Sequence, residues 1–289
     1  MYLPNFDYSA PADIPEVSGL LSQFGLRAKV MAGGTDLLTK MKDGLIEPEV
    51  IISLKNIEEL KKIEYLPGKG VVIGARITHN ELVDSEILNK KYLSVSEAAH
   101  QIAANQVRHM GTIGGNLINA VPSADLPPIL IALNASIKLV GPGGERIIPL
   151  EELFTGVCTT CCAPNEILAA VMIPDQKMTG SNYVKFGSRR SGALAIVGVA
   201  SAVEVDGNTI KDVRIALGAV APTPIRALKA EAFLKGKAIS DAILDEAGVI
   251  ASEEAKPISD IRGSAEYRKN LVHVFTRRTL RKAIDNGHV

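Results

Sequence analysis

Short apolar runs alternate with amphipathic segments along the first part of the chain, as strands and helices do when they follow one another. The segment DIPEVSGLLSQFG predicts a helix with Asp13 as its N-cap, Pro15 in its first turn and Gly25 beyond its end. The helices and strands of this part are expected at residues 13–25, 28–32, 35–44 and 49–54. Their alternation predicts a small α/β unit with βαβ pairing over residues 1–55.

A second block, residues 56–175, mixes strands and helices with an apolar segment that is rich in glycine and proline. Thr78 and Glu81 have the spacing of a capping box, so a helix is expected to start there. Residues 92–110 carry small and apolar side chains at helical spacing and predict one long helix. Residues 111–133 predict a structured loop, because a surface linker would be more polar between its glycines and prolines. Strands are expected at 70–78, 135–150 (a hairpin) and 165–174.

From residue 177 onward the pattern predicts a β-sheet followed by helices. The pair Asp206-Gly207 lies between two alternating apolar runs and is a strong hairpin signal. Helices are expected at 227–236, 240–255 and 265–286. The chain is therefore expected to be α+β, with an N-terminal domain over residues 1–175 and a C-terminal α+β domain over residues 177–289.

The charge balance of the chain favours neither nucleic acid nor an anionic membrane as a partner, although it leaves a local basic patch open. Lysine plus arginine and aspartate plus glutamate both number 32, so the formal net charge is zero and gives no electrostatic reason to expect nucleic acid or an anionic membrane. No apolar run approaches the about 20 residues of a membrane-spanning helix. The start of the chain lacks the basic region and apolar core of a secretory signal. We expect a cytoplasmic enzyme or enzyme subunit.

The three cysteines, Cys158, Cys161 and Cys162, lie together in the segment CTTCC. An odd number argues against a disulfide framework. A zinc or iron–sulfur site usually needs four good ligands at workable spacing, and no histidine lies nearby. We expect reduced, partly buried thiols in a loop rather than a metal or redox centre.

Two glycine-containing segments carry the candidate chemistry. The first, Gly33-Gly34-Thr35-Asp36, lies between an expected strand and an expected helix. Glycines let backbone N–H groups approach a ligand closely, and the start of a helix adds unpaired donors, so this segment could hold a phosphate. It matches neither G-x-G-x-x-G nor a Walker loop. Taken alone, it is a weak signal, and an ordinary strand-to-helix turn is the favoured interpretation.

The second segment, from Gly111 to Asn116, changes this interpretation. It supplies two more adjacent glycines, a threonine hydroxyl and an asparagine amide, about 80 residues after the first. Two such loops suit a diphosphate that is held from two sides. The apolar stretch that follows could cover a planar ring.

The segments MAGGTDLL and QVRHMGTIGGNLINAVPSADLPPILIAL, in this order, resemble the FAD-binding medium subunits of the molybdenum hydroxylase family. That family includes xanthine dehydrogenase-like, nicotinate dehydrogenase-like and aerobic carbon monoxide dehydrogenase-like complexes. The resemblance continues through NEILAAVMIP, YVKFGSRR and VEVDGNTI, and so covers essentially the whole chain. It implies a two-subdomain FAD-binding domain of the vanillyl-alcohol-oxidase/PCMH type, divided near residue 55, ahead of the C-terminal domain.

The resemblance also implies a set of cofactor contacts. The first FAD loop, whose backbone holds the diphosphate, corresponds to Val30, Met31, Ala32, Gly33, Gly34, Thr35, Asp36 and Leu37. The second corresponds to Thr112, Ile113, Gly114, Gly115 and Asn116. Asp125 matches an acid that contacts FAD, Leu168 an apolar residue near the flavin, and Lys185 a basic residue at the isoalloxazine end. A lysine there would stabilise the anionic reduced flavin; the alternative is a solvated lysine on a strand.

The chain departs from the family pattern at two places beside the flavin. Ala103 stands where the xanthine dehydrogenase-like members have a large aromatic residue, so stacking there is lost. An acid that often follows the SRR run is absent, because this chain has Ser191-Gly192-Ala193-Leu194. NAD(P)+ as the electron acceptor is therefore left open. The insertion that carries an extra cluster in 4-hydroxybenzoyl-CoA reductase is absent, so no cluster is expected here.

The function that the resemblance implies is electron transfer within a larger complex. Electrons from a large molybdopterin-binding subunit pass through two [2Fe–2S] clusters of a small subunit to FAD on this chain, and then to NAD(P)+ or another acceptor. A dimer of heterotrimers is expected, and no catalytic residue or metal ligand is assigned to this chain. One alternative is a self-contained FAD oxidase or reductase of the same fold. Another is a module that binds a nucleotide without redox chemistry.

Two further features are expected to have ordinary structural roles. His79 lies in the capping box THNE and is expected to begin a helix rather than to act as a base. The basic run of residues 268–283 is expected to be a helix with a solvated charged face, and a docking surface for a partner subunit is the alternative.

Overall fold

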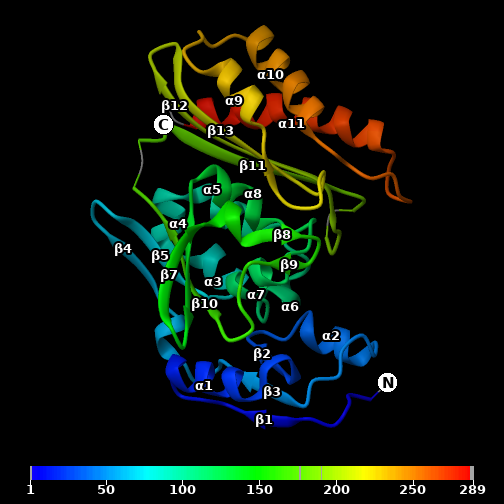
Figure 1. Ribbon diagram of the computed structural model, residues 1–289. Helices are drawn as coiled ribbons and strands as arrows, with labels where there is room; N and C mark the ends of the chain where they lie inside the picture. The colour runs from blue at the N-terminus through cyan, green and yellow to red at the C-terminus, as the bar shows by residue number, and fades with distance from the viewer. Residues whose placement is uncertain (1, 176, 190, 287–289) are drawn as a thin grey trace.

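Three β-sheets follow one another along the molecule, from the N-terminal end at the bottom of Figure 1 to the C-terminal helices at its top. The computed structural model describes residues 2–175, 177–189 and 191–286. Each sheet has its own apolar core, so the chain folds as three packed units. This is the α+β organisation that the sequence predicts.

The first unit is a parallel three-stranded sheet with the order β1-β3-β2. Its elements are β1 (Asp7–Ser9), α1 (Ile14–Phe24), η1 (Gly25–Arg27), β2 (Ala28–Met31), α2 (Leu37–Lys42) and β3 (Val50–Ser53). Asp13 caps α1 by accepting a hydrogen bond from the backbone of Glu16 at 2.9 Å. The predicted βαβ pairing is confirmed by the parallel pairing of β2 with β3, and β1 is an additional strand that the sequence pattern did not indicate.

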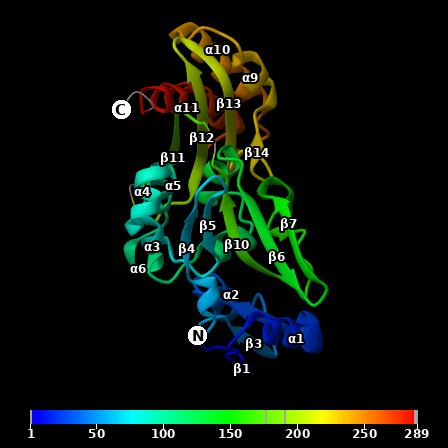
Figure 2. The same cartoon turned by 90° about the vertical axis from the view of Figure 1, so that its left-hand side faces the viewer.

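The second unit is built on an antiparallel sheet with the order β4-β5-β10-β6-β7. Its strands are β4 (Ile63–Leu66), β5 (Gly70–Gly74), β6 (Ser136–Gly141), β7 (Gly144–Pro149) and β10 (Ile167–Ile173), with β8 (Phe154–Gly156) and β9 (Thr159–Thr160) as a separate pair. Its helices are η2 (Glu58–Leu60), α3 (His79–Asp84), α4 (Glu86–Lys91), α5 (Leu93–His100), α6 (Asn105–Arg108), α7 (Ile113–Ile118), α8 (Leu126–Ala132) and η3 (Leu150–Leu153). Figure 2 shows the β6–β7 hairpin reaching down toward α1, against which β6 packs.

The single helix predicted over residues 92–110 is wrong, because the segment is broken into α5 and α6. Ala103, between them, has φ of +43°, a left-handed conformation that cannot continue a helix. The guanidinium of Arg108 donates to the carbonyl of Ile102 at 3.0 Å and holds the connection in place. The break turns residues 102 and 103 toward the interior of the molecule rather than along a helix face.

The loop predicted over residues 111–133 is also wrong in part, because it contains α7 and α8. Thr112 caps α7, and the two prolines of α8 occupy its first turn, where their missing N–H groups cost nothing. Only the segment between the two helices is irregular. Gly114, Gly115, Pro127 and Pro128, which suggested a loop, are therefore at positions that helix starts tolerate.

The third unit is an antiparallel sheet with the order β11-β12-β13-β14, packed against three helices. Its elements are β11 (Gly180–Gly187), β12 (Ala195–Asp206), β13 (Thr209–Gly218), β14 (Ile225–Arg226), α9 (Leu228–Leu234), α10 (Asp241–Glu254) and α11 (Ala265–Asn286). The hairpin predicted at Asp206-Gly207 is confirmed, with Gly207 at φ of +55°. Helices α5 and α8 of the second unit pack on β11, β12 and β13, so the sheet faces both its own helices and the second unit.

Candidate cofactor-binding site

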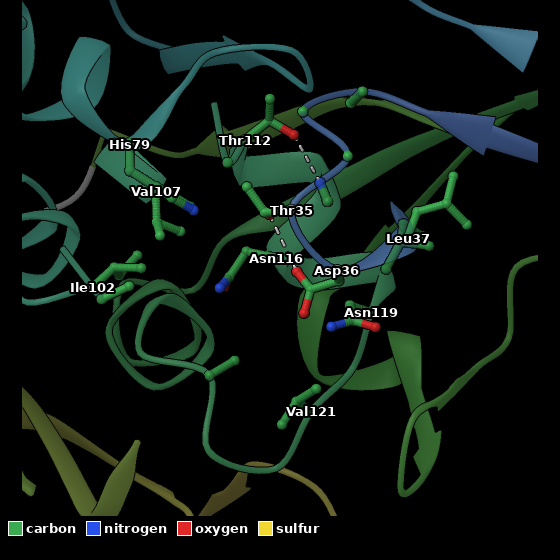
Figure 3. A pocket seen from close by; sticks show the side chains of 18 of the residues that line it. Thr35, Asp36, Leu37, His79, Ile102, Val107, Thr112, Asn116, Asn119 and Val121 are labelled. Carbon is green, nitrogen blue, oxygen red and sulfur yellow. Dashed lines mark hydrogen bonds between the residues drawn. The ribbon is translucent and has the colours of Figure 1, made fainter. Parts of the chain in front are cut away.

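A pocket of about 680 Å³ opens where the first and second units meet. Its wall comes from the β2–α2 turn, α3, the α5–α6 connection, α7, the segment before α8, β11 and residues 192–194. Figure 3 shows His79 and Asn116 directed into this space from α3 and α7. A volume of this size is typical of sites for cofactors.

The first predicted loop lies entirely in the pocket wall. Its members are Val30, Met31, Ala32, Gly33, Gly34, Thr35, Asp36 and Leu37. The backbone N–H groups of residues 33–36 donate to no protein acceptor in the described part of the chain. Gly34 has φ of +73°, a conformation that favours glycine. A run of unpaired backbone donors at a pocket wall suits an anionic group such as a diphosphate.

Gly33 lies where the backbones of the two glycine loops come into close contact. A Cβ atom at this position would lie 1.7 Å from the carbonyl oxygen of Met110 and 2.5 Å from its carbonyl carbon. These are backbone atoms, so no side-chain rotation can relieve the clash. Loops that are far apart in the sequence therefore touch at Gly33, and the sequence alone did not reveal this reason for the glycine.

The second loop has fewer free backbone donors than the first. The N–H groups of residues 113–116 all donate to protein acceptors, at 2.9 to 3.1 Å, one of them to the hydroxyl of Thr112. Helices α2 and α7 have only six residues each, so the helix dipole that the sequence suggested contributes little. The second loop must therefore contribute mainly side chains to any ligand.

The second loop is divided between the pocket and the core. Thr112, Gly115 and Asn116 line the pocket, whereas Ile113 and Gly114 are buried beneath it. A Cβ on Gly114 would lie 2.7 Å from the Cβ of Ala75, so this glycine serves close packing. The side-chain oxygen of Asn116 is buried without a hydrogen-bond partner among the described residues. An orphaned polar atom in a pocket wall fits a site that a polar ligand fills.

Asp125 and Lys185 form a buried ion pair in the pocket wall, with 2.7 Å between Nζ and Oδ2. Lys185 also donates to the carbonyl of Gln101 at 3.0 Å, and the hydroxyl of Tyr183 donates to the other oxygen of Asp125 at 2.8 Å. Burial raises the pKa of Asp125, whereas the charge of Lys185 and the hydrogen bonds from Lys185 and Tyr183 lower it. Lys185 is thus not a solvated strand lysine, since its side chain is only 9% exposed. A flavin nearby would experience an ion pair rather than an isolated cation.

Leu168 and Ala103 differ in their relation to the pocket. Leu168 lies on β10, buried in the core and opposite Leu139 of β6, and is not among the residues that line the pocket. Its place near a flavin stays a prediction. Ala103 lines the pocket, and its carbonyl accepts from the backbone of Gly192 at 3.0 Å, so residues 192–194 are held at the wall.

His79 is a pocket residue to which the sequence analysis gave only a structural role. The capping box is confirmed, because the Thr78 hydroxyl accepts from the backbone of Glu81 at 3.2 Å and the Glu81 carboxylate accepts in return. However, His79 also lines the pocket and is almost fully buried there. Burial, with the positive charge of Arg108, lowers its pKa to about 4, so the ring is neutral at pH 7.

The three cysteines are free thiols. Cys161 and Cys162 are half-buried thiols, as predicted, whereas Cys158 is exposed. Burial raises the pKa of Cys162 to about 12, which disfavours the reactive thiolate. Among the described residues, no group of three or more histidine, cysteine or acidic side chains could hold a metal ion.

The charged face of α11 is partly paired within the chain. Arg277 and Arg281 form ion pairs with Asp245 and Asp241 of α10, so the basic run is a helix with a paired surface. Its use as a docking surface stays a prediction. In the described part of the chain, no helix combines the length and the apolar character needed to span a membrane.

Two family models together match almost the whole chain. The model described as "FAD binding domain in molybdopterin dehydrogenase" matches residues 4–176, which include the first two units. The model described as "CO dehydrogenase flavoprotein C-terminal domain" matches residues 182–283, which include most of the third.

Individual relatives match over their full length. The carbon monoxide dehydrogenase medium chain of Hydrogenophaga pseudoflava is 37% identical over 98% of both chains. The nicotine 6-hydroxylase medium subunit of Paenarthrobacter nicotinovorans is 35% identical over 98% of this chain and 99% of its own. A solved structure of the carbon monoxide dehydrogenase from Hydrogenophaga pseudoflava superposes with a TM-score of 0.95, at 36% identity and over 99% of both chains.

Proposed function

Because the chain belongs to the FAD-binding medium subunits of the molybdenum hydroxylase family, we propose that it relays electrons through FAD within a larger oxidoreductase complex. The electrons come from [2Fe–2S] clusters of a small subunit, which in turn receives them from a large molybdopterin-binding subunit. The chemistry that FAD supplies when bound is to accept single electrons and to deliver a pair. NAD(P)+ or another carrier is the acceptor, and the complex is a cytoplasmic dimer of heterotrimers.

The observation that carries the proposal is the meeting of the two glycine loops at one pocket. Residues 33–36 present unpaired backbone donors, and the side chain of Asn116 lines the facing wall, where its amide NH2 group can donate. We assign the FAD diphosphate to the space between these groups, and the flavin ring to the apolar wall at Ile102 and Ala103. Neither assignment requires a substrate base, which fits a subunit that only relays electrons.

Within this site the chain's own residues have distinct tasks. The backbone of residues 33–36 holds the diphosphate, and the pair of Asp125 and Lys185 fixes the wall where we place the flavin. The hydrogen bond from the backbone of Gly192 to the carbonyl of Ala103 holds residues 192–194 at the entrance through which an electron acceptor would approach. The named relatives act on substrates as unlike as carbon monoxide and nicotine, as expected for a subunit that does not touch the substrate.

Copurification tests this function. An affinity-tagged full chain, expressed with the genes that flank its own in the source genome, should bring down a molybdenum-containing large subunit and a small subunit. Metal analysis of the complex should find molybdenum and iron, and the isolated chain should contain only flavin. A chain that purifies alone and turns over a substrate without partners would contradict the proposal and favour a self-contained oxidase or reductase.

A further inference from the structure

His79 lies against the junction of the two glycine loops. Its backbone N–H donates to the carbonyl of Gly111 at 3.0 Å, and its ring packs on the same residue. A Cβ on Gly111 would be 3.1 Å from Cδ2 and 3.2 Å from Nε2 of the ring. The peptide between Met110 and Gly111 is in turn the part of the chain that Gly33 touches. His79 is therefore held at the point where the two loops meet.

The ring has no hydrogen-bond partner of its own in the described part of the chain. Its Nδ1 atom is buried without a partner, and no protein hydrogen bond is formed by Nε2. A buried N–H without an acceptor is rarer in proteins than a buried acceptor without a donor. We therefore place the proton of the neutral ring on Nε2, at the edge that lies beside Gly111 and the pocket.

The second loop needs a donor of this kind. The backbone N–H groups of residues 113–116 are already engaged by protein acceptors. On this side of the pocket, side-chain donors must then face the ligand, and Figure 3 shows His79 and Asn116 directed into the same space. We propose that His79 donates a hydrogen bond from Nε2 to a diphosphate oxygen of the cofactor.

This inference rests on the proposed place of the diphosphate between the two loops, so its test must separate the two claims. ADP carries the diphosphate without the flavin, and riboflavin carries the flavin without any phosphate. Both can be measured by competition against FAD on the full chain after removal of its flavin. The variant His79→Phe removes the donor, His79→Gln restores an amide donor near Nε2, and His109→Phe is the control at an exposed histidine of the neighbouring segment.

The expected result is a parallel loss of FAD and ADP affinity in His79→Phe. A hydrogen bond to a charged oxygen corresponds to roughly a 10- to 100-fold loss for both ligands. Riboflavin affinity should be unchanged, His79→Gln should recover part of the loss, and His109→Phe should match the wild type. The melting temperature of the flavin-free variant must stay near the wild-type value, which separates a contact with the ligand from a role in folding alone.

Other outcomes would overturn one claim or both. Equal affinity of His79→Phe and wild type for FAD and ADP would reject the hydrogen bond from His79 while leaving the proposed function intact. A loss for FAD and riboflavin but not for ADP would move the contact from the diphosphate to the flavin, which also rejects the inference. Wild-type chain that fails to bind ADP in competition with FAD would reject the placement of the diphosphate itself.

Discussion

Replacing Gly33 by alanine should drive the two glycine loops apart. The new Cβ would lie 1.7 Å from the carbonyl oxygen of Met110, whereas real Cβ contacts are essentially never under 3.0 Å, so the loops must separate by about 1.3 Å. Hydrogen bonds of ordinary length do not survive such a change. We expect Gly33→Ala to weaken FAD binding because the two sides of the site no longer reach the diphosphate together.

The size of the effect follows from the bonds that are lost. A hydrogen bond to a charged group contributes about 1.5–3 kcal/mol, so losing one lowers FAD affinity by roughly 10- to 100-fold, and losing two abolishes retention during purification. The strain on the flavin-free chain is that of an overpacked contact, about 1–3 kcal/mol of unfolding free energy. The third unit has its own core and should remain folded.

The assay is flavin fluorescence titration of the flavin-free chain, with thermal unfolding measured in parallel. Gly19→Ala is the matched control, since a Cβ there meets no atom within 4 Å and the residue lies in α1. Gly34→Ala provides a second comparison. Its Cβ would meet only side-chain atoms of Leu38 and Met31 at 3.2 to 3.4 Å, and the cost is the strain of φ +73°. Wild-type affinity in Gly33→Ala would refute the claim that contact between the loops forms the site.

Three further changes test other parts of the account. Lys185→Met leaves the charge of Asp125 buried and should cost about 3–5 kcal/mol of unfolding free energy in urea, most of which the added change Asp125→Asn should restore. Gly114→Ala should destabilise the chain by about 1–3 kcal/mol by overpacking, and an unchanged melting temperature would contradict this. The pKa of His79 is about 4 in the folded chain and 6.5 in the unfolded chain. As the pH falls, the unfolded chain therefore binds a proton at His79 before the folded chain does. Stability should therefore fall between pH 6.5 and 4, by up to about 3 kcal/mol more than in His79→Gln.

The local elements could be predicted where neighbouring residues determine them. The cap at Asp13, the capping box at Thr78 and the turn at Asp206-Gly207 all depend on contacts within a few residues, and all three are observed. The same reasoning failed at Ala103, where no glycine or proline marks the break between α5 and α6. Its left-handed conformation is stabilised by a contact with Gly192, which is distant in sequence. A long-range contact of this kind overrides helical spacing.

The sequence predicted many of the residues that line the candidate site, but not how those residues contact one another. The glycine pairs were recognised as a candidate phosphate site, but Gly33 and Gly114 turn out to serve close packing against Met110 and Ala75. His79 was assigned only to a capping box because its neighbours in the pocket come from other segments. The ion pair of Asp125 with Lys185 was likewise not foreseen, since nothing in the sequence brings the two residues together.

The placement of the cofactor diphosphate is tested most directly by a crystal structure of the full chain with FAD bound. We expect diphosphate oxygens within about 3 Å of the backbone nitrogens of residues 33–36, with the side chain of Asn116 on the opposite side. The flavin ring should lie along Ile102 and Ala103. A diphosphate bound outside the space between the two glycine loops would contradict the account.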